Sequence, residues 1–168
     1  MLKSAPPKVL VSGCLLGQPV RYDGSHKGAQ HAVLDRWLAR QQVVSLCPET
    51  AAGLPTPRLP AEIVGGTSMA VLRHAAQVRD SAGNDVTAAF VLGAQLALQL
   101  VQRHGIRVAV LKEFSPTCGS SQVYDGQFAG HTVPGEGLAC SLLRQAGVAV
   151  FSETQWEAAA AQLEAYAA

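Results

Sequence analysis

Four short apolar runs alternate with helical stretches along this chain, and this alternation limits its fold more than any other feature. The runs lie at residues 8–12, 43–47, 108–111 and 148–151, and they are rich in Val and Leu. Runs of this length and composition are typical of strands buried on both faces of a sheet. Strands that alternate with helices predict an α/β fold with a mainly parallel sheet and helices on both faces.

The stretches between and after these runs carry helical spacing or strong helix formers: 29–41, 85–104, 134–145 and the residues from 154 onward. Short apolar pieces within 61–82 favour a small antiparallel excursion, and an Asp-Gly turn within 123–129 predicts a hairpin. No repeat or linker marks a second domain. We therefore expect one Rossmann-like domain over residues 1–168, with its core at about residues 8–153.

The composition excludes several classes of protein. Of the 168 residues, 48% are hydrophobic and 15% are charged, which is typical of a globular chain and not of a disordered one. The net charge of +1 provides no chain-wide field for nucleic acid or an anionic membrane. The sequence has no apolar run of about 18 residues, and its start does not have the pattern of a signal peptide. We expect a cytoplasmic protein with reduced cysteines.

Three of the four cysteines follow predicted strands. Cys14 comes two residues after the first run, Cys47 closes the second, and Cys118 lies in the loop that leaves the third. The carboxyl ends of parallel strands lie at one edge of a sheet, where ligands bind, so these thiols are predicted to meet there. On spacing alone, a metal site and three small core residues both remain open. Cys140 lies among apolar residues of a predicted helix, which favours a buried, inert thiol.

The number of thiols narrows the choice of metal. Three thiolates are soft ligands that favour iron–sulfur clusters, copper(I) or zinc. A structural zinc ion usually has four N or S ligands, and no nearby histidine obviously supplies the fourth. A four-iron cluster is normally held by four cysteines, so three would leave one iron without a protein ligand and open to substrate.

At these cysteines the sequence resembles a known bacterial family. The runs that carry the resemblance are VSGCLLGQPVRYDG, SLCPET with GLPTPRLPAEI, and LKEFSPTCGSSQVYDGQFAG. This family was long known only as a domain of unknown function, and some of its members are thiouracil desulfidases. The similarity extends from about residue 9 to residue 153 and keeps the three cysteine motifs in the family's order.

The resemblance implies both a cofactor and a reaction. It places a 4Fe-4S cluster on Cys14, Cys47 and Cys118, with one iron not ligated by protein. It implies an oxygen-sensitive, hydrolytic desulfidase that replaces the sulfur of a thiopyrimidine by oxygen and releases hydrogen sulfide. The substrate would be thiouracil or a thiouridine nucleotide. The catalytic residues that it implies are Glu49 and Ser115.

The chemistry of these two residues suits such roles, and ordinary structural roles suit them as well. Glu49 lies two residues after Cys47, where a carboxylate can act as general base for water, but it also suits the first turn of a helix. Ser115 can orient water or substrate by hydrogen bonding, or it can cap a turn before Pro116.

Three further residues are candidates for substrate binding. Asp23 follows the Cys14 loop, where it either lines the pocket or forms a turn that ends at Gly24. Arg58 lies in a proline-rich loop, where it meets an anion such as a nucleotide phosphate or is simply solvated. Ser120 follows Cys118, where backbone N–H groups and hydroxyls hold a sulfur or an anion, or form an ordinary turn.

Two rival functions belong to other classes. A non-catalytic iron–sulfur electron-transfer or sensor protein would place Cys140 near the other three thiols as a fourth ligand. A metal-free thiol enzyme with Cys118 as nucleophile would need a base such as histidine beside it. The partners expected for the main hypothesis are a small-molecule thiopyrimidine and the iron–sulfur assembly machinery. The near-neutral charge disfavours long RNA as a substrate.

Overall fold

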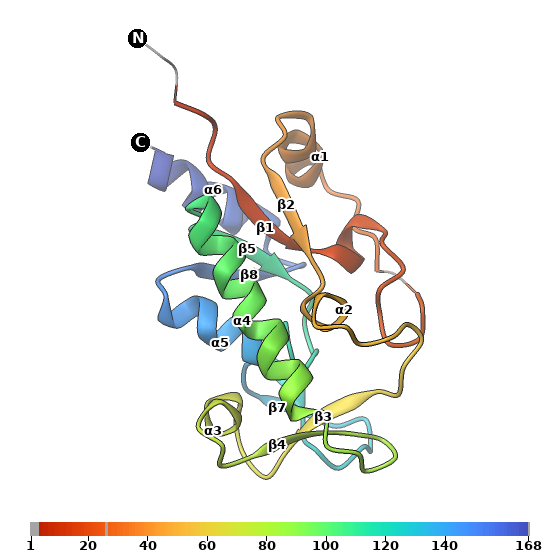
Figure 1. The fold of residues 1–168 in the computed structure, drawn as a ribbon. Coiled ribbons are helices and arrows are strands. Elements are labelled where there is room, and N and C mark those ends of the chain that lie inside the picture. The colour runs from red at the N-terminus through yellow and green to blue at the C-terminus, as the bar shows by residue number, and fades with distance from the viewer. Residues whose placement is uncertain (1–3, 26, 168) are drawn as a thin grey trace.

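A four-stranded parallel sheet forms the centre of the molecule (Figure 1). The computed structural model describes residues 4–25 and 27–167. The sheet order is β2-β1-β5-β8, and every neighbouring pair is parallel. The strands are those expected from the four apolar runs: β1 (Val9–Ser12), β2 (Val43–Leu46), β5 (Val108–Leu111) and β8 (Ala149–Ser152). The prediction of an α/β domain with a mainly parallel sheet is confirmed.

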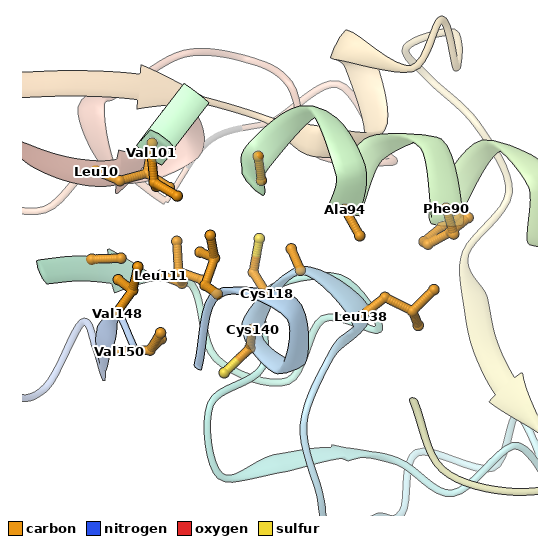
Figure 2. Close-up of a cluster of buried hydrophobic side chains, with 14 of the residues drawn as sticks. Leu10, Phe90, Ala94, Val101, Leu111, Cys118, Leu138, Cys140, Val148 and Val150 are labelled. Atoms are coloured by element: carbon orange, nitrogen blue, oxygen red, sulfur yellow. The ribbon is translucent and has the colours of Figure 1, made fainter. Parts of the chain in front are cut away.

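Helices cover both faces of this sheet (Figure 1). Residues Val9 and Val11 of β1 pack with α1 (Ala32–Ala39) and α6 (Trp156–Ala167), whereas Leu10 faces a second cluster formed with α4 (Thr87–His104) and α5 (Leu138–Gln145). Figure 2 shows this second cluster, in which Leu10 of the sheet lies beside Val101 of α4, and Phe90 of α4 faces Leu138 of α5. Side chains that alternate between two cores explain why the strands are apolar throughout.

The antiparallel part lies beside the main sheet and confirms the predicted excursion. Strand β3 (Ala61–Val64) pairs with β4 (Gln77–Asp80), and β6 (Gln122–Tyr124) pairs with β7 (Thr132–Pro134). The helix α3 (Ser68–Leu72) between β3 and β4 was not expected. The Thr67 hydroxyl accepts the Ala70 N–H at its start, and Val71 is fully buried, so capping and burial favour a helix over a direct hairpin.

One predicted boundary is wrong. The apolar spacing predicts a helix from residue 134, but α5 begins at Leu138 because Pro134 pairs with Gln122 across the second hairpin. No helix in the described part of the chain is long and apolar enough to cross a membrane.

The strand order places a switch point at the centre of the sheet. From β1 the chain crosses to β2 on one side, and it later returns through α4 to β5 on the other side of β1. The connections after β1 and β5 therefore leave in opposite directions and open a crevice at the carboxyl ends of these strands. Two short helices lie at this edge, η1 (Gly13–Leu16) after β1 and α2 (Pro48–Ala51) after β2.

Candidate functional site

The three cysteines that follow strands line one cavity. Cys14 lies in η1, Cys47 is the residue before α2, and Cys118 lies in the loop that follows β5. The cavity has a volume of about 420 Å³, and its wall also includes Glu49 and Ser115. The fold thus brings together residues more than 100 positions apart, as expected from the parallel sheet, while the assignment of the thiols as ligands stays a prediction.

Two close backbone contacts fix the neighbours of Cys47 and Cys118. A Cβ atom at Gly93 in α4 would lie 2.5 Å from the carbonyl oxygen of Pro48, which follows Cys47. A Cβ atom at Gly137, just before α5, would lie 2.4 Å from the carbonyl oxygen of Thr117, which precedes Cys118. Both positions exclude any side chain, so α4 and α5 pack directly against the backbone that carries the two thiols.

The loop that carries Cys118 is organised by hydroxyl and carboxylate acceptors. The Ser115 Oγ accepts the N–H of Thr117 at 3.0 Å and that of Cys118 at 3.1 Å. Ser115 therefore caps the turn around Cys118 and also lines the cavity. The turn-capping role proposed from the sequence is present, and it leaves the hydroxyl proton of Ser115 available for another acceptor.

The carboxylate of Glu113 binds the segment after Cys118. Its Oε1 accepts the N–H groups of Ser120, Ser121 and Gln122 at 2.8, 2.9 and 3.0 Å. Its Oε2 accepts the hydroxyls of Ser120 at 2.7 Å and Ser121 at 3.1 Å. Burial raises the pKa of Glu113, but these hydrogen bonds outweigh it and lower the pKa to about 2. The N–H groups predicted to hold an anion thus hold a carboxylate of the protein.

Two of the three thiols at the cavity have raised pKa values, which favour their neutral form. Burial, together with a smaller contribution from the nearby Cys47, raises the pKa of Cys14 to about 11. The pKa of Cys118 also lies well above its ordinary value because the thiol is buried, although a hydrogen bond with Ser12 opposes this shift. A metal binds thiolates, so loading this site would displace the protons of these thiols.

The chemistry of the donors at the cavity suits an iron–sulfur cluster. Across residues 4–25 and 27–167, no three His, Cys, Asp or Glu side chains lie close enough together to hold one metal ion. Cysteine thiolates are the usual ligands of four-iron clusters. Three soft donors around a cavity of about 420 Å³ therefore fit an iron–sulfur cluster.

Glu49 faces the same cavity from the first turn of α2. Arg58 Nε donates to Glu49 Oε1 at 3.2 Å, and both side chains are largely buried. The remaining guanidinium nitrogens donate to the carbonyls of Val20 and Pro55 and to the Thr56 hydroxyl. Arg58, predicted to meet a substrate anion, is thus bonded on every side by the protein and orients Glu49.

The other two predicted substrate-binding residues lie outside the cavity wall. Asp23 is exposed, and its Oδ1 accepts the N–H and the hydroxyl of Ser25. These hydrogen bonds lower its pKa. Ser120 is buried and donates to Glu113 through both its N–H and its hydroxyl. The structure therefore gives both residues partners within their own loops.

Cys140 lies in α5, is fully buried, and does not line the cavity. In Figure 2 its sulfur atom and that of Cys118 point in opposite directions. Burial raises the pKa of Cys140 to about 12. The interpretation of Cys140 as a buried core thiol agrees with this placement.

Comparison with known proteins identifies the family. The model of the 2-thiouracil desulfurase family matches residues 9–155, almost the whole chain. The chain belongs to this family. It is 48% identical to a solved structure described as the [4Fe-4S]-dependent thiouracil desulfidase TudS, with a TM-score of 0.86 over 94% of this chain and 98% of that one. It is also 40% identical to the uncharacterized protein YbbK of Bacillus subtilis (strain 168), over 88% of this chain and 96% of that protein.

Two buried carboxylates of this 2-thiouracil desulfurase family member were missed by sequence reasoning. Glu113 comes two residues after a strand at the ligand-binding edge, a position that could have singled it out. Glu62 lies within β3 and is 8% exposed, and its Oε1 accepts the N–H groups of Gly126 at 2.9 Å and Phe128 at 3.2 Å. No local pattern indicates that an acid in a short strand binds a loop 64 residues away.

We expect replacement of Glu113 by Gln to lower the free energy of unfolding at pH 7 by about 2–3 kcal/mol, because its hydrogen-bond donors lose an ionised acceptor. The folded pKa of about 2 lies below the ordinary 4.5, so the stabilisation is complete above about pH 5 and is lost as the pH falls toward 2. Urea unfolding of iron-free protein between pH 7 and pH 3 measures the difference between wild type and variant.

That difference should stay constant from pH 7 to about pH 5 and shrink as the pH falls further toward 3. The control is Glu164→Gln, an exposed residue of α6 outside its first turn, which should change stability little at any pH. A difference for Glu113→Gln that stays constant from pH 7 to pH 3 would contradict the proposed role of its charge.

Proposed function

We propose that this protein is a [4Fe-4S]-dependent desulfidase that replaces the sulfur of thiouracil by oxygen and releases hydrogen sulfide. The observation that carries the proposal is the meeting of Cys14, Cys47 and Cys118 at one cavity that Glu49 also lines. The family match and the 48% identity to a protein described as a thiouracil desulfidase support the same reaction. A thiouridine nucleotide is the alternative form of the substrate, and iron–sulfur assembly machinery is the expected partner for loading.

The cluster would be held by Cys14, Cys47 and Cys118, which leaves one iron without a protein ligand. When bound, the cluster supplies a Lewis acid that polarises the thiocarbonyl sulfur. The chain itself supplies the shape of the cavity, and its apolar wall, which includes Val20, Leu46 and Phe114, limits access of bulk water.

Glu49 would move the protons of the reaction. Arg58 holds its Oε1, and among the described residues its Oε2 has no hydrogen-bond partner, so this oxygen is available to water. Glu49 takes a proton from the attacking water as the water oxygen bonds to the ring carbon. It then delivers this proton, and after it the proton that remains on the added oxygen, to the departing sulfur as the C–S bond breaks. Water and the thiocarbonyl thus become a carbonyl and hydrogen sulfide, with no change in oxidation state.

Ser115 would orient the reactants. Its Oγ accepts two backbone N–H groups, which fixes the oxygen in place, and its own O–H can donate to the substrate or to water. One of these N–H groups belongs to Cys118 and the other to Thr117, so Ser115 also holds the backbone at the cluster ligand. Ser115 therefore links the position of a cluster ligand to the position of the substrate.

The two rival functions lack a supporting observation. A fourth thiolate ligand is not offered by Cys140, which lies outside the cavity lining. A metal-free thiol enzyme would need a base at Cys118, but among the described residues no histidine lines this cavity. Burial also raises the pKa of Cys118, which disfavours the reactive thiolate.

Replacement of cysteines one at a time tests the cofactor. Protein purified without oxygen should be brown and contain acid-labile sulfide in amounts that match its iron. Alanine at Cys14, Cys47 or Cys118 should remove the colour and most of the iron, because each thiolate binds the cluster. Cys140→Ala is the matched control and should keep both. A colourless wild-type protein that binds only zinc, or loss of iron from Cys140→Ala alone, would contradict the proposal.

Replacement of Glu49 by Gln tests the reaction. Hydrogen sulfide release from 2-thiouracil should fall by about 100-fold or more, because general acid–base catalysis is lost while the shape of the side chain is kept. The brown colour and the iron content should not change. The control is Glu157→Gln on α6, which should release sulfide at the wild-type rate. Wild-type activity in Glu49→Gln would exclude Glu49 from proton transfer.

A further inference from the structure

Exposed aromatic side chains gather at the cavity of the three cysteines. Four tyrosine and phenylalanine side chains in the described residues are exposed, and all four line this cavity: Tyr22, Phe114, Tyr124 and Phe128. Each is 37–39% exposed. Aromatic rings usually contribute to cores, so a group of exposed rings confined to one cavity indicates a surface that a ligand covers.

Two of these rings are held by an unfavourable backbone conformation. Phe114 has a φ of 72° and Phe128 a φ of 55°. Bulky residues rarely adopt positive φ, because their Cβ atom crowds the backbone, and such conformations concentrate at ligand clamps and active sites. A Gly or Asn would satisfy the backbone better at both positions. Aromatic side chains at these two positions therefore do not serve the local backbone, which favours a role in ligand binding.

The surrounding structure keeps both rings in place. In the loop that carries Phe128, the N–H groups of Gly126 and Phe128 both donate to the buried carboxylate of Glu62. Phe114 forms an isolated bridge with Val123 of β6, and its ring centroid lies 6.4 Å from that of Tyr124. The rings are thus presented to the cavity by fixed loops before any ligand arrives, which lowers the entropic cost of binding.

We propose that Phe114 and Phe128 bind the substrate by stacking on the face of its pyrimidine ring. This role rests on the proposed function and specifies what that site selects, a planar six-membered heterocycle. Aromatic side chains stack on any flat π-system, so Phe114 and Phe128, here called the aromatic clamp, recognise the planarity of the ligand. A saturated ring, which is puckered, loses this contact.

Binding of two non-reacting ligands to the holoenzyme tests the clamp. Wild-type protein prepared without oxygen should bind uracil about tenfold more tightly than 5,6-dihydrouracil by calorimetric titration, because only uracil is planar. Phe128→Asn and Phe114→Asn should each weaken uracil binding about threefold and lower the preference for uracil, and the double variant should bind both ligands equally. Phe128→Trp should bind uracil within about twofold of wild type. Asn tolerates positive φ, so the melting temperature of Phe128→Asn should not fall.

The control is Val133→Ala, an exposed residue of β7 in the same hairpin that does not line the cavity. It should bind both ligands as wild type does. If wild-type protein releases sulfide from 2-thiouracil but Phe128→Asn and Phe114→Asn keep the wild-type preference for uracil, the clamp is overturned and the proposed function stands. If wild-type protein neither binds uracil nor releases sulfide, both are overturned.

Discussion

The parallel pairing of β1 with β2 on one side and β5 on the other decides where the chemistry of this protein takes place. The connections after β1 and β5 lead to opposite sides of the sheet and open a crevice at the carboxyl ends of the strands. The segments that follow β1, β2 and β5 each bring one cysteine to it. Close helix packing then fixes the positions of two of these cysteines. Gly93 and Gly137 let two helices pack directly against the backbone beside Cys47 and Cys118. A different strand order would separate the thiols.

Two buried carboxylates organise the irregular segments around the crevice. Glu113 binds the residues after Cys118, and Glu62 binds the loop that carries Phe128. A carboxylate can accept several backbone N–H groups at once, so each acid gives a short loop the hydrogen bonds that a helix or sheet would otherwise provide. The cavity therefore has rigid walls even where the chain has no regular structure. This explains how exposed aromatic rings and a strained backbone persist there.

The sequence predicted the architecture because the signals are local and agree with one another. Apolar β-branched runs predicted all four strands of the sheet, and the topology then placed Cys14, Cys47 and Cys118 at one edge. Local sequence patterns did not predict the features that depend on contacts between distant residues. Pro134 pairs with Gln122 and delays α5, and the segment after Cys118 faces the carboxylate of Glu113 where an external anion was expected. The Arg58 side chain likewise binds Glu49, a contact that spacing alone does not reveal.

The central claim is that three cysteines of this 2-thiouracil desulfurase family member hold a cluster whose fourth iron is open to substrate. A crystal structure of protein prepared without oxygen and reconstituted with iron and sulfide tests it most directly. The account predicts a four-iron cluster bonded to the sulfur atoms of Cys14, Cys47 and Cys118, with one iron facing Glu49 across the cavity. A cluster bonded to Cys140, or a single metal ion bonded to the three thiolates, would contradict it.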